Sequence, residues 1–133
     1  MTREMLEAWL EETWGVEGDF PFEEDFVTKV YRHRDNRKWF ALLMRIPASR
    51  LGLPSEALLD VVNLKCSEDV RDSLWGTEGI HPAYHMSKRH WISVRLDGSV
   101  ERQTVELLLG VSYSLTKKKK HSRSSSSLSS GSF

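Results

Sequence analysis

The first fourteen residues carry apolar side chains at helical spacing. Thr2 is a favourable N-cap, and Gly15 has the backbone freedom that ends helices. Between them, the spacing predicts a helix whose apolar face consists of Met5, Leu6, Trp9 and Leu10. Trp9 on this face is expected to be a core residue.

The next apolar segments are shorter and are typical of strands. Extended segments are expected at residues 16–20, 26–32 and 39–46, with a tight turn at residues 34–37 joining the last two as an antiparallel hairpin. The segment from Trp39 to Met44 is apolar on both faces and predicts a central strand with Trp39 in the core. Residues 47–54 are expected to form a surface insertion, and residues 58–65 a fourth strand.

The second half of the domain contains two further predicted helices and two further predicted strands. Ser67 is expected to cap a short helix that turns Val70 and Leu74 inward, and Ser99 to cap a final helix. Between the helices, residues 84–86 and 90–96 predict one short and one longer strand. The order of elements predicts a two-layer α+β fold with a mostly antiparallel sheet of five or six strands and helices on one side.

Composition changes the picture only at the end of the chain. Residues 117–133 contain four consecutive lysines and eight serines, and they lack the apolar residues needed to offset the entropy of ordering. We therefore expect a folded domain at residues 1–116 and a disordered Lys/Ser-rich tail at residues 117–133. The net charge of zero is also uneven, because residues 1–27 hold nine carboxylates against Arg3 alone.

Several classes of protein are disfavoured. The apolar runs are too short for a transmembrane helix, the N-terminus lacks the pattern of a signal peptide, and Cys66 has no partner for a disulfide, so a cytoplasmic location is expected. Glycine-rich phosphate loops and nucleophile elbows are missing from the sequence. We expect a protein without catalytic activity or cofactor.

The densest polar and aromatic cluster lies at residues 81–91. It combines histidines, cations and aromatic rings that can contact phosphates, stack or transfer protons, and its candidate binding residues are Tyr84, His85, Lys88, Arg89, His90 and Trp91. Lys65 ends a strand just before a predicted helix start, a favourable place for an anion. Arg34 and Arg37 lie at the tip of the basic hairpin, which also carries Arg32, His33 and Lys38. The alternative interpretation is structural, with Tyr84 and Trp91 in the core and with the cations and histidines solvated or capping.

A metal site is less favoured. His81, His85 and His90 do not share one face of a strand, and the carboxylates Glu4, Glu7 and Glu11 are typical of a solvated helix face.

Several strings of residues resemble the MmcQ/YjbR family of small bacterial proteins. They are Phe20–Phe22, Lys38–Ala41, Asn63–Cys66, Gly79 with the block Pro82–Trp91, Leu96–Gly98 and Ser112–Tyr113. The resemblance implies a two-layer α+β fold of the CyaY-like superfamily and DNA binding through a double-wing arrangement of hairpins. Ser87 stands where this family usually has Asn, and the tail lies outside the family pattern.

Three hypotheses follow. The first is a monomeric DNA-binding protein whose cations contact phosphates without reading bases, with the hairpin tip acting as a wing. The second is a small-anion or metabolite-binding domain with a pocket around Lys65, Lys88 and Arg89. The third is frataxin-like metal binding by Glu4, Glu7 and Glu11, with Asp19, Glu23 and Glu24 nearby.

Overall fold

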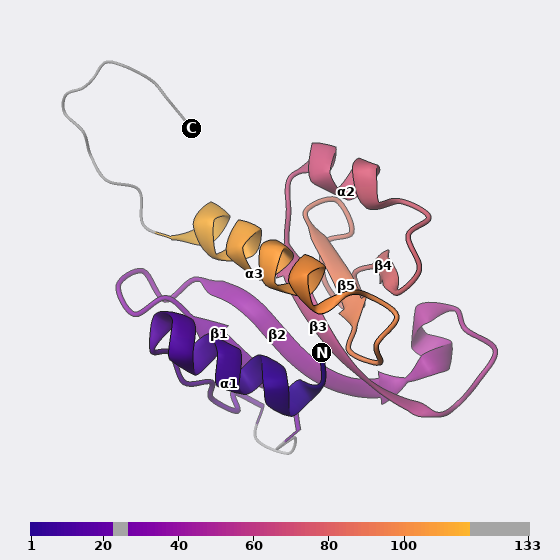
Figure 1. Cartoon of the computed structure of the whole chain (residues 1–133), viewed down its shortest axis with the longest axis horizontal. Coiled ribbons are helices and arrows are strands. Elements are labelled where there is room, and N and C mark those ends of the chain that lie inside the picture. The colour runs from indigo at the N-terminus through magenta and orange to yellow at the C-terminus, as the bar shows by residue number, and fades with distance from the viewer. Residues whose placement is uncertain (23–26, 118–133) are drawn as a thin grey trace.

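Three α-helices and five strands follow one another in the computed structural model, which describes residues 1–22 and 27–117 (Figure 1). The elements are α1 (Arg3–Trp14), β1 (Lys29–Arg32), β2 (Trp39–Pro47), the 3-10 helix η1 (Ala48–Leu51), β3 (Leu58–Lys65), α2 (Glu68–Leu74), β4 (Ile80–Pro82), β5 (Trp91–Arg95) and α3 (Arg102–Thr116). The predicted tail from residue 118 onward, and Phe26 of the predicted second strand, lie outside the described residues.

Helix α1 begins and ends where local signals predict. The Thr2 hydroxyl accepts a hydrogen bond from the Met5 amide at 3.2 Å, and Gly15 has φ 63° with its amide bonded to the Glu11 carbonyl. Leu6 and Leu10 are fully buried on the apolar face, whereas Trp9 packs against the core but is only partly buried.

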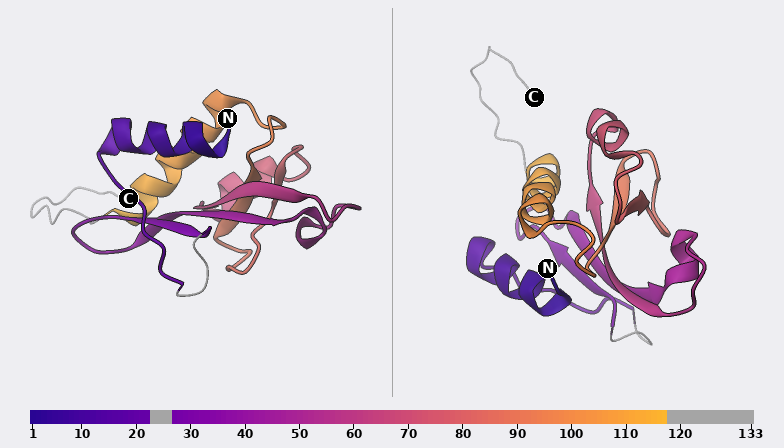
Figure 2. Two further views of the ribbon diagram at one scale, coloured as in Figure 1. Left: turned by 90° about the horizontal axis from the view of Figure 1, so that it is seen from below. Right: turned by 45° about the vertical axis from the view of Figure 1, so that its right-hand side comes forward.

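The five strands form one antiparallel sheet in the order β1-β2-β3-β5-β4. Helices α1 and α3 lie over the same face of this sheet, and Figure 2 shows the two layers edge-on. Val70 and Leu74 of α2 pack against the cluster that lies under these helices. The predicted two-layer α+β fold is confirmed.

The two faces of the sheet have different apolar clusters. The helix side holds the larger cluster, which includes Phe40, Leu64 and Leu109. On the opposite side, a smaller cluster gathers Val30, Leu42, Met44, Ile46 and Val61, and it is bordered by Trp39, Leu51, Leu59, Tyr84 and Met86. Because both faces of β2 are buried, its sequence is apolar without alternation.

A bulge at the start of β2 decides which aromatic side chain enters the core. Tyr31 pairs with Ala41 but Arg32 pairs with Trp39, so Phe40 is the extra residue in this strand pair. Phe40 is fully buried on the helix side, and Trp39 borders the smaller cluster on the other side. The prediction that Trp39 is a core residue is therefore correct only in part.

Three predicted elements differ from the structure. Residues 16–20 contribute one isolated bridge, between Asp19 and Val30, instead of a strand. The short strand β4 forms at Ile80–Pro82, because residues 84–86 turn away from the sheet. Helix α3 begins at Arg102 and not after Ser99, whose amide and hydroxyl both donate to the Asp97 carboxylate within the preceding turn.

Candidate functional site

The turn after β4 is fixed to the sheet through its main chain. The Asn63 side-chain amide donates to the Tyr84 carbonyl at 2.8 Å, and the Tyr84 amide donates to the Ser93 hydroxyl at 3.0 Å. Ser93 in turn donates to the Asn63 side-chain oxygen at 2.5 Å. Asn63 and Ser93 are fully buried register partners on β3 and β5, so two polar side chains in the sheet hold this turn in place.

The held turn presents the ring of His85. His85 has φ 63°, in the left-handed region, and its ring centroid lies 3.8 Å from that of Tyr84. Tyr84 is partly buried against the smaller cluster, whereas His85 is exposed. The alternative structural interpretation is thus correct only in part for Tyr84, which borders the smaller cluster without being fully buried.

The cations of the same block have partners within the fold. The Lys88 ammonium donates to the Ala83 carbonyl at 2.9 Å, and the Arg89 guanidinium contacts the Glu68 carboxylate at 2.8 Å. This ion pair lowers the pKa of Glu68 from its usual value, chiefly through the hydrogen bond from Arg89. Arg71 donates to the carbonyls of both Lys88 and Arg89. These contacts brace the turn against α2, and a role of Lys88 and Arg89 in phosphate binding stays a prediction.

His90, Lys65 and Trp91 meet where β3 and β5 begin to separate. Lys65 and Trp91 are register partners, and the Cys66 amide donates to the His90 carbonyl at 2.8 Å just beyond them. Lys65 and Trp91 are half-buried and His90 is exposed. Cys66 is buried, and burial raises the pKa of its thiol, so its environment does not favour a thiolate.

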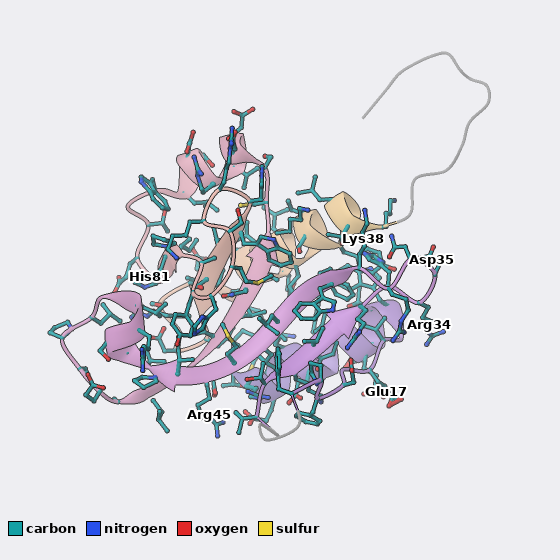
Figure 3. The ribbon with its side chains drawn as sticks, turned by 180° about the vertical axis from the view of Figure 1, so that it is seen from behind. Glu17, Arg34, Asp35, Lys38, Arg45 and His81 are labelled. Atoms are coloured by element: carbon teal, nitrogen blue, oxygen red, sulfur yellow. The ribbon has the colours of Figure 1, made fainter. Side chains whose placement is uncertain are left out.

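The basic hairpin lies at this same end of the sheet and is fastened to α3. The Asn36 side chain donates to the Thr116 carbonyl at 2.9 Å, and the His33 ring contacts the Thr116 hydroxyl at 2.8 Å. His33 is buried, and desolvation lowers its pKa from the usual value. His33 is therefore not one of the exposed cations of the tip. Arg34 and Lys38 are exposed (Figure 3), and so is Arg37.

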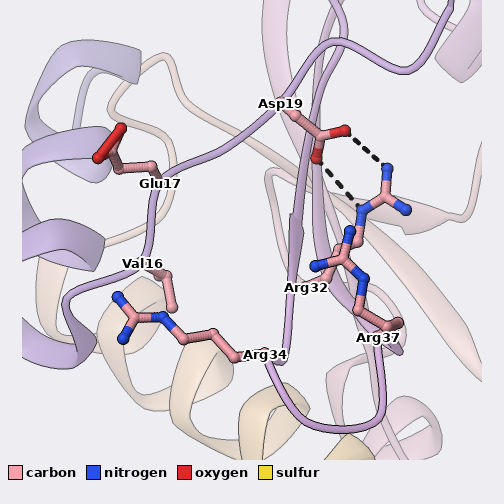
Figure 4. A pocket seen from close by; sticks show the side chains of 6 residues that line it. All are labelled: Val16, Glu17, Asp19, Arg32, Arg34 and Arg37. Carbon is pink, nitrogen blue, oxygen red and sulfur yellow. Dashed lines mark hydrogen bonds and ion pairs between the residues drawn. The ribbon is translucent and has the colours of Figure 1, made fainter.

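A hollow of about 230 Å³ lies between this hairpin and the segment that follows α1 (Figure 4). It is lined by Val16, Glu17, Asp19, Arg32, Arg34 and Arg37. Arg32 makes two hydrogen bonds to the Asp19 carboxylate, at 3.2 and 2.7 Å, and Arg34 donates to the Gly15 carbonyl at 2.6 Å. Sequence reasoning identified the arginines, considered Asp19 only as a carboxylate near a metal site, and missed Glu17. The only available signal for these two carboxylates was their position in the extended segment before the hairpin.

Four cations at this end have no ion pair or side-chain hydrogen bond with the described residues: Arg37, Lys38, Lys65 and Lys117. The first two belong to the hairpin and the third ends β3. Lys117 follows α3, whose last residue contacts the hairpin. In the sequence, Lys117 is followed directly by three more lysines.

Among the described residues, the carboxylates of α1 are not gathered with other ligands into a metal site. Glu7 accepts the Lys29 ammonium at 2.6 Å. Within residues 1–22 and 27–117, no three His, Cys, Asp or Glu side chains come together in a way that would hold a metal ion. Glu23 and Glu24, which the metal hypothesis also invokes, lie outside the described residues. None of the helices in the described part of the chain is both long and apolar enough to cross a membrane.

Together, the fold and this basic end define a class: small two-layer α+β proteins with an antiparallel sheet and a hairpin projecting from one end. The model of the family described as YjbR matches residues 11–115, and the chain belongs to this family.

Relatives and solved structures agree with this assignment. The uncharacterised protein YyaQ of Bacillus subtilis is 36% identical over 117 residues, which cover 88% of this chain and 99% of YyaQ. A crystal structure of a Pseudomonas syringae protein is similar with a TM-score of 0.86 at 38% identity, covering 88% of this chain and 100% of that one. Deinococcus radiodurans protein DR2400 gives a TM-score of 0.67 at 27% identity, covering 89% and 80% of the two chains.

Proposed function

We propose that this protein binds DNA weakly, through the phosphate backbone, at the hairpin end of its sheet. The observation that carries the proposal is the gathering of four cations without carboxylate partners among the described residues: Arg37, Lys38, Lys65 and Lys117. Because no attached carboxylate competes for them, they are available to replace the counterions of a polyanion. This shifts the interface from Lys88 and Arg89, which have internal partners, toward the hairpin.

The same geometry favours sequence-tolerant binding by a protein that is not an enzyme. Phosphate contacts position a protein on DNA but carry no sequence information. The thiol of Cys66 is buried with a raised pKa, and the hydroxyl groups of Ser93 and Ser112 are engaged within the fold. A lone buried cysteine also agrees with a cytoplasmic location, and the proposal is for a monomer in that compartment.

The test separates the domain from the lysines of the tail, which attract polyanions by themselves. We define the tail-neutral chain as the full chain with Lys118→Ser, Lys119→Ser, Lys120→Ser and Arg123→Ser. Binding of this chain to fluorescent DNA is measured by anisotropy between about 20 and 200 mM salt, a range over which phosphate contacts weaken strongly.

The variant that tests the proposal is Arg37→Asn with Lys38→Gln in the tail-neutral chain. Asn is chosen because Arg37 has φ 62°, which Asn tolerates better than most residues. We expect weaker binding to every DNA sequence and a salt slope lower by about two, one for each lost phosphate contact.

The matched control removes two cations from the other end of the molecule: Arg50→Gln in η1 and Arg102→Gln at the start of α3. We expect this control to bind DNA as tightly as the parent, because its cations lie away from the proposed interface. Such a result would show that the weakening depends on where the charge is removed and not on net charge. Equal weakening in both double variants, or no binding by the tail-neutral chain at low salt, would refute the proposal.

A second candidate function rests on the hollow in Figure 4. Three guanidinium groups line it, those of Arg32, Arg34 and Arg37, and guanidinium groups bind small oxyanions well. These guanidinium groups support a small-anion site at the hairpin instead of around Lys88. Inorganic phosphate should then raise the melting temperature of the protein, and Arg34→Gln should abolish that rise, whereas Arg50→Gln should leave it intact.

A further inference from the structure

Four half-buried side chains form a row across the end of the sheet from which the hairpin projects. They are Arg32 on β1, Trp39 on β2, Lys65 on β3 and Trp91 on β5. Arg32 pairs with Trp39, and Lys65 pairs with Trp91. The two pairs are neighbours, because Ala41 of β2 pairs with Leu64 of β3 and the start of β2 and the end of β3 lie just beyond that pair.

All four side chains belong to the face of the sheet opposite α1 and α3. Trp39 borders the smaller cluster on that face, and the Arg32 guanidinium lies 5.8 Å from the centre of its ring. On β3, Val61 belongs to the same cluster, so alternation places Lys65 on this side. Trp91 is the direct partner of Lys65, and it alternates with Ile92, which is buried on the helix side.

The row alternates cation, aromatic ring, cation, aromatic ring. Neighbouring strands lie about 4.8 Å apart where they pair. Because the Ser112 hydroxyl lies between Phe40 of β2 and Lys65 of β3, the row spans more than about 14 Å and the two indole rings are more than roughly 10 Å apart, with Lys65 between them. Asp19 holds Arg32 beside Trp39 through two hydrogen bonds, whereas the Lys65 ammonium has no partner among the described residues. This alternation matches a nucleic-acid strand, along which bases and phosphates also alternate.

We propose that this row binds single-stranded DNA, with bases stacked on Trp39 and Trp91 and a phosphate held by Lys65. The inference rests on the proposed function and names its substrate class. In a duplex, the faces of the bases are covered by their neighbours and are not available to an aromatic side chain. A single strand exposes them, and every base has a face that stacks, so the row selects strandedness and not sequence.

The experiment uses the tail-neutral chain with an oligothymidylate of about 12 nucleotides, within the usual range of site sizes, and a duplex of the same length. Affinity is measured by anisotropy, and stacking by quenching of tryptophan fluorescence. We expect tighter binding of the single strand. Trp91→Leu should weaken single-strand binding about five- to tenfold, the lower end of the effect of losing one stacked base, and should leave duplex binding nearly unchanged.

The matched control is Trp75→Leu. Trp75 follows α2, is 55% exposed and has the Arg71 guanidinium 5.9 Å from its ring, but it lies outside the row. Its replacement should not change either affinity. Lys65→Gln provides a second variant that keeps both indole rings, and it should lower the salt slope for the single strand by about one. Far-ultraviolet circular dichroism verifies that each variant is folded.

The outcomes separate this inference from the proposed function. If the parent binds neither DNA at low salt, both fail. If it binds single strand and duplex equally, or if Trp91→Leu and Lys65→Gln behave like Trp75→Leu, the row is not a stacking surface while the proposed function stands. Preference for the single strand that is lost in the row variants alone supports the inference.

Discussion

The Ser112 hydroxyl completes the sheet where β2 and β3 separate, and its removal is the most direct test of how the fold is held. It accepts the Lys65 amide at 2.9 Å and donates to the Phe40 carbonyl at 2.5 Å. Between regular strands these two backbone groups would bond to each other. Ser112 of α3 therefore joins both strands to the helix in place of one ladder hydrogen bond, and it is fully buried.

Replacing Ser112 with Ala leaves a buried N–H and a buried C=O without partners. Each such group costs about 1–3 kcal/mol, so we expect the free energy of unfolding to fall by about 2–4 kcal/mol. Ser114→Ala is the matched control, because Ser114 is exposed on the same helix and gains the same helix propensity from the change. The difference between the two variants isolates the hydroxyl.

Urea denaturation followed by tryptophan fluorescence and circular dichroism measures both variants, with unchanged m-values as the sign that the same surface is exposed. Hydrogen exchange at the Lys65 amide should accelerate in Ser112→Ala, because this amide loses its acceptor. Equal free energies of unfolding for Ser112→Ala and Ser114→Ala would refute the reasoning. A Lys65 amide that remains protected from exchange in Ser112→Ala would also refute it, because the Lys65 amide and the Phe40 carbonyl would then have formed the direct bond between the strands.

Three further predictions concern stability. A chain truncated after Thr116 should have the same melting temperature as the full chain, because residues 117–133 are expected to add no stability. A melting temperature lower by several degrees would contradict this expectation. Trp39→Ala should cost on the order of 2 kcal/mol and Phe40→Ala about 3–5 kcal/mol in urea denaturation, because only Phe40 is fully buried; the reverse order would contradict the bulge. Burial lowers the pKa of His33, so the unfolded chain binds more protons below pH about 6.5 and stability falls as pH drops through that value. His33→Asn should reduce this slope and leave a remainder from His81, whose pKa burial also lowers; an unchanged slope would exclude His33 as its source.

The elements that sequence reasoning located correctly are those fixed by neighbours along the chain. Thr2 and Gly15 bound α1, Ser67 caps α2, and β3 covers Leu58–Lys65 as predicted. In each case the signal and the structure it specifies lie within a few residues, so the pattern contains the information. The antiparallel hairpin and the two-layer architecture follow from the order of these elements.

The tertiary structure decided which groups pair with each other where the partners come from different elements. The sequence left Arg89 open between a phosphate contact and a solvated or capping cation, and its partner in the fold is Glu68 on α2, 21 residues away. Lys88 instead donates to a carbonyl in its own turn. The strand predicted at residues 84–86 is replaced by a turn because side chains from two other strands, Asn63 on β3 and Ser93 on β5, bond to the carbonyl and the amide of Tyr84.

The candidate site shows the same division. The sequence by itself established a basic hairpin and an aromatic, cationic segment near residue 90, because residue types and spacing are local facts. Whether they share a surface depended on strand order and register, which pair Arg32 with Trp39 and Lys65 with Trp91. Register is set by burial of one face against the helices and by the extra residue at Phe40, and neither has a local signal. Only the folded sheet could therefore bring the hairpin, Lys65 and Trp91 to one end.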